Sequence, residues 1–437
     1  MTIRFDDAWQ GARQVAEEVA RGGRDVVLAR DLTGRISLIL DDRASALPSE
    51  DQASIERRLS AVAGPFAAAM PTLLASGLFA PEVFLDSSDL GLVEDRRIGR
   101  GRLRTADRGA VGGDWTTTPK ASDKRVTLYG FKGGVGRSTA TFLLARHLAS
   151  EGRCVLVVDL DLESPGVGAL LQHEANLPEF GLVDYLVEAA VGNEAGVDLV
   201  VRSQIIEPVG NGEVWVAPAS GRPRRGYDYI AKLNRVYVDL PAGAEGDHGL
   251  RFADRIHAAV EACEAEVARR SRTPEVVLLD SRAGVHDLAA VAITRLSGYS
   301  LLFAMDNPQT WTGYRALFRQ WGRIPELART MRDRIQMVAS FVPPGGGEGE
   351  YLSGFRDRAQ ACLAETLYDD AASDDPDAYN PAPADDSAPH APLPIVYTGE
   401  LVGLDHVRSP NWYSSTLVNA AYERFVRGAA EFVRGEP

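Results

Sequence analysis

The apolar runs in the last three quarters of this chain limit most strongly what it can fold into. They are short, nearly unbroken in Val, Leu and Ile, and separated by segments of helical periodicity. Such strands are typical of a parallel sheet covered by helices on both faces, because each strand is then buried on both sides. The runs that predict strands are RVTLYGF from Arg125, CVLVVDLDLE from Cys154, GEVWVAPAS from Gly212, PEVVLLDSRAG from Pro274, SLLFAMDNP from Ser300 and IQMVASFVPP from Ile335.

The region before these runs predicts a separate small module over residues 1–95. Its run DVVLARDLTGRISLILDD holds two strand-like stretches around a Gly-containing turn, which favours a hairpin. Helical patterns surround this run, over residues 7–21, 51–63 and 65–76. The module is therefore expected to be α+β, and we assign it no function. Residues 96–124 are rich in Gly, Arg and Thr without periodicity and predict a linker, which leaves the α/β domain to 125–437.

Composition excludes several classes of protein. No apolar run approaches the roughly 18 residues that a membrane-spanning helix needs. The start, MTIRFDDAWQ, lacks the apolar core of a secretory signal. Three scattered cysteines offer neither a disulfide framework nor paired metal-ligand spacing. We therefore expect a soluble cytoplasmic protein.

The net charge of −14 is concentrated in one segment. Eight acidic residues and no Lys or Arg lie between Glu365 and His390, in a stretch rich in Pro, Asp and Ala. This composition predicts a mobile surface insertion over 365–393. The rest of the chain is mildly acidic, and direct DNA binding is not expected, because backbone phosphates require a basic face.

The segment YGFKGGVGRSTATFLLARHLA, from Tyr129 to Ala149, carries the strongest chemical signal. A strand, a glycine turn and a helix amino terminus present several backbone N–H groups to an anion, aided by the helix dipole. Glycines at 133, 134 and 136 let the backbone approach a phosphate closely. The alternative is a purely structural turn, which the flanking strand and helix disfavour.

Two hydroxyls and one arginine define the chemistry of this loop. Ser138 is placed to bind Mg²⁺, and Thr139 can reach an α-phosphate. Ordinary loops of the form G-x-x-x-x-G-K-[ST] carry a lysine where this chain has Arg137, and a glycine where it has Phe131. Arginine keeps the charge, but it is longer and planar, so phosphate binding is expected to survive while turnover depends on its placement. Slow hydrolysis and binding without hydrolysis both remain open.

Taken with its neighbours, the loop KGGVGRST resembles the deviant phosphate loop of the ParA/MinD-type ATPases, whose usual form is KGGVGK[ST]T. The resemblance extends over nearly everything from Arg125 onward and implies a doubly wound P-loop NTPase sheet. Further segments match that family's motifs in order. They are VLVVDLDLESPG, GLVDYLVEA, VWVAPAS, VVLLDSRAG and MDNPQT.

The resemblance implies roles for individual residues, with ATP and Mg²⁺ as cofactors. Lys132 matches the lysine that reaches a partner subunit's phosphates across an ATP-sandwiched homodimer. Asp161 matches the carboxylate that positions the attacking water, so Lys132, Arg137 and Asp161 form the catalytic set. The expected nucleotide contacts are Gly133, Gly134, Val135, Gly136, Arg137, Ser138, Thr139 and Asn307, and the expected Mg²⁺ site is Ser138, Asp159 and Asp280.

Two places depart from the family pattern or add to it. Near Ser340 this chain reads MVASFVPP, where the family carries an asparagine that faces the base, so adenine is implied only by the resemblance. Arg282 adds a cation beside the expected switch, either catalytic or in a structural ion pair. At the carboxyl terminus, Leu417, Ala421, Phe425, Ala429 and Phe432 recur at helical spacing and predict a closing helix packed on the sheet rather than a membrane-binding one.

Two functions compete at this point. The first is an ATP-dependent switch that dimerises around nucleotide and signals to an unidentified protein partner, as expected of the arginine-bearing relatives found in bacterial signalling or conflict proteins. The second is a pseudo-ATPase that keeps nucleotide while it serves as a scaffold. Kinase and iron–sulfur roles are disfavoured, because the chain lacks a tyrosine-rich tail and neighbouring cysteines.

Overall fold

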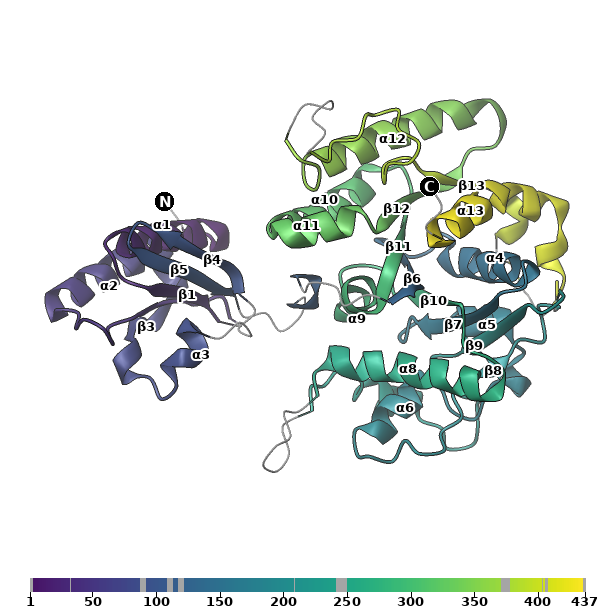
Figure 1. Cartoon of the computed structure of the whole chain (residues 1–437), viewed down its shortest axis with the longest axis horizontal. Coiled ribbons are helices and arrows are strands. Elements are labelled where there is room, and N and C mark those ends of the chain that lie inside the picture. Colours follow the sequence, from purple (N-terminus) through teal and green to yellow (C-terminus); the bar gives the residue numbers. More distant parts are fainter. Residues whose placement is uncertain are drawn as a thin grey trace. The chain divides into compact units, whose positions relative to one another are not determined.

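The computed structural model describes residues 3–31, 33–86, 92–107, 113–116, 122–207, 209–240, 250–370, 378–402, 404 and 408–434. The chain divides into two compact units, Met1–Gly113 and Asp114–Pro437 (Figure 1). Among the described residues, no helix is long and apolar enough to cross a membrane.

Unit 1 is built on a five-stranded mixed sheet with strand order β3-β2-β1-β5-β4. β1 and β2 form the predicted antiparallel hairpin, and β5 runs parallel to β1. The apolar sides of α1 and α2 pack on one face of this sheet, whereas α3 lies against the other. The bounds are α1 Phe5–Arg21, β1 Val26–Arg30, β2 Ile36–Leu40, α2 Ser49–Ala63, β3 Ala67–Leu74, α3 Pro81–Leu85, β4 Leu92–Ile98 and β5 Gly101–Asp107.

Two predictions in this region are wrong. The helix expected over 65–76 is instead strand β3, which tolerates Pro71 because it is an edge strand and leaves one side of its backbone unpaired. The linker expected over 96–124 contains β5 and the start of the first strand of unit 2, and the boundary expected at 95 falls inside β4. This Arg-rich sequence forms strands because β4 and β5 pair with each other in antiparallel fashion. Arginines are neutralised by ion pairs between the two strands, such as that of Arg102 with Asp95.

Unit 2 contains an eight-stranded sheet of order β13-β12-β11-β6-β10-β7-β9-β8. All neighbouring pairs are parallel except β8 with β9, so the predicted α/β class and doubly wound sheet are confirmed. The bounds are β6 Ser122–Gly130, β7 Cys154–Leu160, β8 Val201–Arg202, β9 Glu213–Ala217, β10 Val276–Ser281, β11 Ser297–Ala304, β12 Ile335–Val342 and β13 Leu393–Val396.

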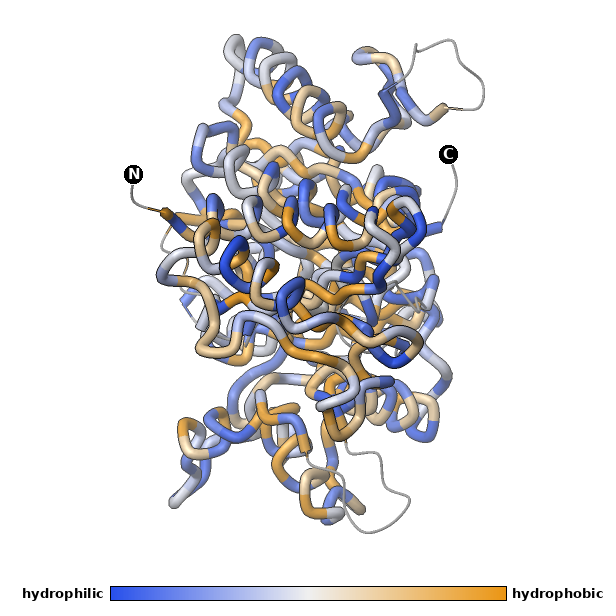
Figure 2. Tube along the Cα trace, turned by 90° about the vertical axis from the view of Figure 1, so that its left-hand side faces the viewer, coloured by the Kyte–Doolittle hydropathy of each residue, from blue (hydrophilic) through white to orange (hydrophobic). Residues whose placement is uncertain are grey.

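Helices cover both faces of this sheet (Figure 1). α4, α5 and α13 share one hydrophobic core, while α6 and α8, and separately α10, α11 and α12, fill two cores on the other face. Hydrophobic and hydrophilic residues alternate around the helical turns in Figure 2, as expected of helices that bury one side. The bounds are α4 Arg137–Ser150, α5 Val167–Leu171, α6 Leu182–Ala189, α7 Tyr229–Leu233, α8 Phe252–Arg270, α9 Asp287–Val291, α10 Pro308–Gly322, α11 Pro325–Arg332, α12 Glu348–Ala364 and α13 Thr416–Arg434.

The terminal helix α13 packs as the sequence predicts. Phe425 and Ala429 are fully buried against the core that also holds α4, although Leu417 of the same stripe is 61% exposed. The helix passes so close to β13 that a Cβ on Gly428 would lie 2.5 Å from a methyl carbon of Leu393. Gly428 therefore permits this contact rather than interrupting the helix.

The acidic segment 365–393 is only partly a surface insertion. Residues 371–377 lie outside the described part of the chain. On either side, Tyr368 and His390 are buried, and the Tyr368 hydroxyl lies 2.8 Å from His390 Nδ1. Tyr379 packs edge-on against Tyr368. These aromatic rings hold the described parts of the segment in place. The prediction of a mobile surface insertion is therefore wrong for those residues.

One close approach ties the phosphate-loop segment to α10 and generates a prediction. A Cβ on Gly313 would lie 2.2 Å from a ring carbon of Phe131. We expect Gly313→Ala to lower the free energy of unfolding of unit 2 by about 1–3 kcal/mol, because the ring must leave its place. Urea unfolding followed by tryptophan fluorescence measures this loss. Gly349→Ala, on α12 with no atom within 4 Å of its added Cβ, is the matched control and should be neutral or stabilising; equal effects of the two changes would contradict the prediction.

Candidate phosphate-binding site

The loop between β6 and α4 has the backbone that its glycines predict. Gly134 and Gly136 have φ angles of +74° and +82°, in the left-handed region that favours glycine. A Cβ on Gly133 or Gly134 would meet no atom within 4 Å, so the space beside them is open. Val135 is instead buried and packs toward Gly130. The loop thus offers an open concave backbone ahead of the amino terminus of α4, as anion binding requires.

Arg137 lies at the centre of the site. Its side chain is only 8% exposed, and its Nη2 donates to Asp161 Oδ2 at 3.1 Å. Its Nε lies 3.4 Å from Asp280 Oδ1. Ser138 Oγ donates to the other oxygen of Asp280 at 2.6 Å. The structure therefore brings together four of the residues that the sequence predicts for catalysis and metal binding, from α4, β10 and the end of β7.

Asp159 is placed beside Asp280 by the strand register, in which the two residues are direct partners on β7 and β10. Its carboxylate accepts backbone N–H groups of Asp161, Gly166 and Gly168 at 3.1–3.3 Å. Burial, and then the neighbouring Asp280, raise the pKa of Asp159 to about 8. Burial likewise raises the pKa of Asp280 and Asp161, and Arg137 opposes the shift in both. Three carboxyl groups that resist ionisation are thus crowded around the guanidinium of Arg137.

Lys132 and Asn307 lie apart from this cluster. Lys132 Nζ donates to Gln309 Oε1 at 2.5 Å, at an exposed position. The side chain of Asn307 accepts the N–H of Thr310 at 2.9 Å and caps the start of α10. Lys132 therefore contacts the first turn of α10, the helix that Asn307 caps. The roles predicted for Lys132, Asn307 and Thr139 remain predictions.

A second charged cluster adjoins the site, and only one of its members was singled out from sequence. Glu163 forms an ion pair with Arg282 and accepts a hydrogen bond from the Tyr237 hydroxyl. His286 Nε2 lies 3.8 Å from the same carboxylate, and burial, then Arg282, lower the pKa of His286. Arg282 is therefore held in an ion pair in this structure. Glu163 could have been identified as a site residue from the sequence, because it lies only two residues after Asp161.

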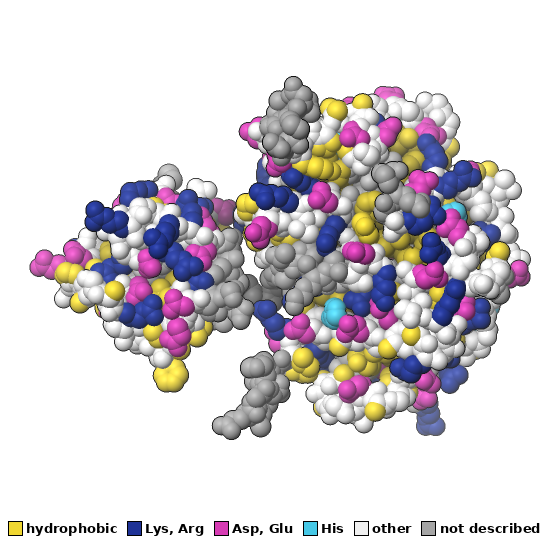
Figure 3. All heavy atoms as spheres, in the orientation of Figure 1, with side chains coloured by type: hydrophobic (Ala, Val, Ile, Leu, Met, Phe, Trp, Pro, Cys, Tyr) yellow, Lys and Arg dark blue, Asp and Glu magenta, His cyan; other side chains and the backbone are white. Residues whose placement is uncertain are grey.

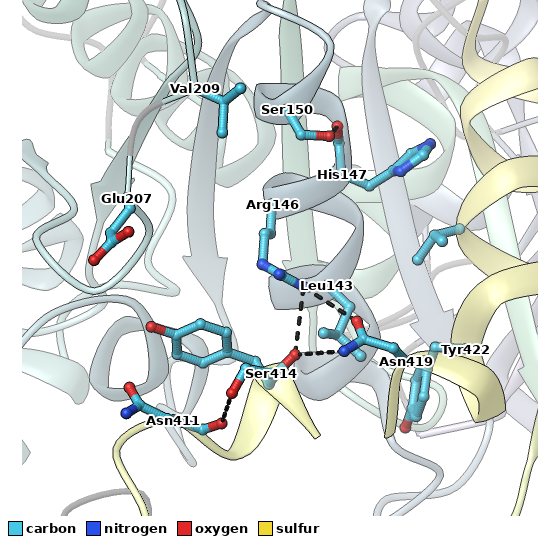
Figure 4. Close-up of a pocket in the computed structure, with 12 residues that line it drawn as sticks. Leu143, Arg146, His147, Ser150, Glu207, Val209, Asn411, Ser414, Asn419 and Tyr422 are labelled. Carbon is cyan, nitrogen blue, oxygen red and sulfur yellow. Dashed lines mark hydrogen bonds between the residues drawn. The ribbon is translucent and has the colours of Figure 1, made fainter. Parts of the chain in front are cut away.

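A cavity of about 480 Å³ lies beside the outer surface of α4 (Figure 4). Arg146 projects from α4 and donates to the Tyr413 carbonyl at 3.3 Å and to Asn419 at 3.2 Å. Tyr422 also lines this cavity, and its hydroxyl would lie 3.3 Å from a Cβ on Gly136. None of the residues that line the cavity is a predicted site residue, although Tyr422 brings it next to Gly136 of the phosphate loop.

The surface of unit 2 matches its moderate acidity. On the face seen in Figure 3, Lys and Arg side chains are interspersed with Asp and Glu, with hydrophobic residues between them. The basic side chains visible on this face are therefore not gathered into a uniformly basic patch.

Comparison with known proteins finds a match to the core of this unit. Residues 122–220 match the model of a family described as ParA: NUBPL iron-transfer P-loop NTPase. The matched segment runs from β6 through the phosphate loop and β7 to the residues that follow β9, and it therefore contains Arg137, Asp159 and Asp161.

Individual relatives are more distant. The chain is 30% identical over 145 residues to a cytosolic Fe-S cluster assembly factor, CFD1, of Yarrowia lipolytica, which covers 30% of this chain and 47% of that protein. The chain thus matches less than half the length of this curated relative. Among solved structures it is similar to pNOB8 ParA bound to nonspecific DNA, with 14% identity, a TM-score of 0.43 and coverage of 72% of this chain and 99% of the other. The chain is also similar to a cobyrinic acid a,c-diamide synthase from Mycobacterium smegmatis, with 16% identity and a TM-score of 0.35. That match covers 54% of this chain and 82% of the other.

The cysteines bear on the iron–sulfur activity named for that relative. Cys154, Cys263 and Cys362 are all described, and each is buried, on β7, α8 and α12. Burial raises the pKa of Cys362 to about 12, and that of Cys263 further. Iron–sulfur clusters are held by cysteine thiolates. The described residues contain no group of three or more His, Cys, Asp or Glu side chains arranged to hold a metal ion.

The open space at Gly133 generates a prediction that separates folding from binding. Its φ is not positive, and an added Cβ meets no protein atom within 4 Å, so we expect Gly133→Ala to keep the wild-type melting temperature. The same Cβ would project beside a bound phosphate, so nucleotide affinity should fall by roughly tenfold or more, equivalent to about 1.4 kcal/mol. Calorimetric titration with Mg-ATP and thermal melting measure the two effects. A variant that melts and binds like the wild type would show that the loop holds no phosphate at Gly133.

Proposed function

We propose that this chain is a cytoplasmic ATP-binding switch that hydrolyses ATP slowly, dimerises around the nucleotide and is recognised in that state by a protein partner. One observation carries the proposal. Arg137 is buried beneath the glycine loop, and its Nη1, 3.7 Å from an ideal Cβ on Gly130, has no hydrogen-bond partner among the described residues. A buried N–H without a partner is costly, and a triphosphate oxygen is a strong acceptor for a guanidinium.

The residues present also fit Mg²⁺. Ser138 supplies a hydroxyl ligand, and Asp280, already hydrogen-bonded to it, stands with Asp159 where carboxylates would hold the waters of the ion. Bound Mg²⁺ would neutralise charge on the phosphates. With ATP and Mg²⁺ bound, Asp280 and Asp159 would face the metal ion, and Arg137 would donate to phosphate oxygens in place of the carboxylates. Both cations would then offset part of the negative charge of the phosphates.

Hydrolysis then depends on Asp161. In this structure its carboxylate is paired with Arg137, and the proposed exchange of partners frees it to orient a water molecule toward the γ-phosphate. Arginine delivers its charge through a longer, planar group than lysine, so we expect slow turnover. The same ion pair favours the second candidate function, a nucleotide-binding scaffold. If Arg137 keeps Asp161 paired after ATP binds, no water is oriented and the bound state is permanent.

Phosphate release distinguishes these two functions. We expect purified protein with Mg-ATP to release phosphate, and Asp161→Ala to reduce the rate by about 10²-fold or more while ATP still binds. Asp357→Ala, at an exposed position of α12, is the matched control and should leave the rate unchanged. Release equal in the wild type and in Asp161→Ala would contradict the catalytic role. ATP binding without any release would establish the scaffold.

Dimerisation provides an independent prediction. With a slowly hydrolysed ATP analogue and Mg²⁺, light scattering should report twice the chain mass of 47.2 kDa, and without nucleotide the single mass. Lys132→Ala should abolish the doubling and retain nucleotide binding, because it removes the charge expected to reach the partner subunit. Gln309→Ala removes only the hydrogen-bond partner of Lys132 and should still dimerise. A single mass for the wild type in every condition would exclude the sandwiched dimer.

A further inference from the structure

The cavity beside the outer surface of α4 has the size and lining of a small-molecule site (Figure 4). Its volume of about 480 Å³ lies in the range that such sites occupy, roughly 300–1,000 Å³. Its walls come from α4, from α13, from the residues just before α13, and from Glu207 and Val209 between β8 and β9. Polar and apolar side chains both line it, and small-molecule sites combine the two.

Arg146 forms one wall of this cavity, and a single nitrogen holds its guanidinium in place. Nη1 donates to the Tyr413 carbonyl and to the Asn419 amide oxygen, and the guanidinium carbon lies 5.3 Å from the centroid of the Tyr413 ring. Nε and Nη2 have no hydrogen-bond partner in the described part of the chain, and neither is a buried atom. These two atoms form the edge of a guanidinium that binds a carboxylate through two parallel hydrogen bonds. Arg146 is therefore oriented in advance for a carboxylate.

The charge of Arg146 is not neutralised by the protein. Both partners of its Nη1 are neutral, and it forms no ion pair with any residue that the structure describes. By contrast, Arg434 near the end of α13 pairs with Glu151 at 3.2 Å. His147 also lines the cavity, but burial lowers its pKa, so it is neutral at pH 7. The positive charge in the cavity therefore comes from Arg146.

Glu207 is the acidic residue of the cavity lining. It is exposed, and it has neither a hydrogen bond nor an ion pair with another described residue. Figure 4 shows Glu207 and Arg146 projecting from separate walls. A carboxylate at this place repels a second anionic group of a ligand and attracts a cationic one. A single molecule that carries one carboxylate and one amino group suits both walls.

The rest of the lining indicates the body of that molecule. Leu143 of α4 and Val426 of α13 present apolar surface to the cavity, and Val209 is 55% exposed beside it. An apolar side chain that covers these residues gains affinity because it removes their surface from water. The lining thus combines a guanidinium edge, a carboxylate and an apolar patch.

On these contacts, we propose that the cavity is a second ligand site, which binds a free apolar amino acid. Its carboxylate lies on the Nε–Nη2 edge of Arg146, its amino group lies toward Glu207, and its side chain covers Leu143 and Val426. A nucleotide does not suit this site, because Glu207 repels a polyphosphate.

Three molecules of similar shape test this proposal. Leucine carries both charged groups, isocaproate lacks the amino group, and isoamylamine lacks the carboxylate. We expect leucine to bind the full chain, and each of the other two to bind roughly tenfold more weakly or less, because each loses hydrogen bonds to a charged group. Calorimetric titration measures the three affinities.

Two variants assign the charged groups. Glu207→Gln should keep the wild-type melting temperature, since Glu207 has no partner among the described residues, and should weaken leucine by about tenfold while isocaproate is unaffected. Arg146→Lys keeps the charge but loses the two-donor edge, so it should weaken both leucine and isocaproate. Arg427→Ala, exposed on α13 and outside the cavity lining, is the matched control and should bind all three as the wild type does.

The results decide the proposal in either direction. Leucine that fails to bind, or that binds equally to the wild type and to both variants, would overturn the site. Equal affinities for leucine and isocaproate would overturn the role of Glu207 and with it the choice of an amino acid.

The cavity is joined to the phosphate loop by α4, which begins at the loop, and by Tyr422. The Tyr422 hydroxyl lines the cavity and would lie 3.3 Å from a Cβ on Gly136. If nucleotide binds as proposed above, saturating leucine should change the affinity for Mg-ATP by about fivefold or more, and ATP should change that for leucine by the same factor. In Glu207→Gln the effect should require correspondingly more leucine.

This linkage keeps the two sites distinguishable. Leucine binding without any ATP binding would refute the nucleotide function and support the amino-acid site. ATP binding without any leucine binding would do the reverse. An ATP affinity that saturating leucine leaves unchanged would exclude coupling through α4 and Tyr422.

Discussion

A single guanidinium lets several carboxylates share the edge of a buried sheet. The parallel register of β7 and β10 makes Asp159 and Asp280 direct partners, and both are inaccessible to water. Two such groups repel one another and resist ionisation, and Asp161, just after β7, lies beside them with its N–H bonded to Asp159. Arg137 contacts Asp161 and Asp280 and opposes that repulsion. The local structure of the site thus depends on a cation that a phosphate and a metal ion can replace together.

Much of this site could be predicted because its residues follow strand ends. Parallel strands bring their carboxyl ends to one edge, so the order of apolar runs already implies that Arg137, Asp159 and Asp280 converge. The glycine loop is similarly local, since its left-handed positions at Gly134 and Gly136 require only glycine itself. What no local pattern indicates is the pairing within the cluster. That the guanidinium lies against Asp161 rather than in solvent is a property of the folded edge.

The errors share a physical cause. β3 and β5 have weak strand signals, because one contains a proline and the other is rich in arginine, and both exist through pairing with strands elsewhere in unit 1. The composition of the acidic segment predicts mobility, yet Tyr368 is buried in the core that α10, α11 and α12 share, and its hydroxyl contacts the buried His390. The link from Glu163 to Tyr237 and Arg282 joins three segments distant in sequence. In each case a long-range partner overrides the local preference.

The strand order also has a consequence for synthesis. Unit 1 pairs strands that all lie before Asp107, so its sheet can close while the rest of the chain is still being made. β6, which precedes the phosphate loop, pairs with β10 and β11, which begin at Val276 and Ser297. The loop therefore emerges from the ribosome long before the strands that enclose it. Domains fold from the amino terminus during synthesis, and long-range parallel pairing is slow. The apolar strand β6 therefore stays unpaired until β10 and β11 have been made. We expect chaperones to bind the growing chain most during this time.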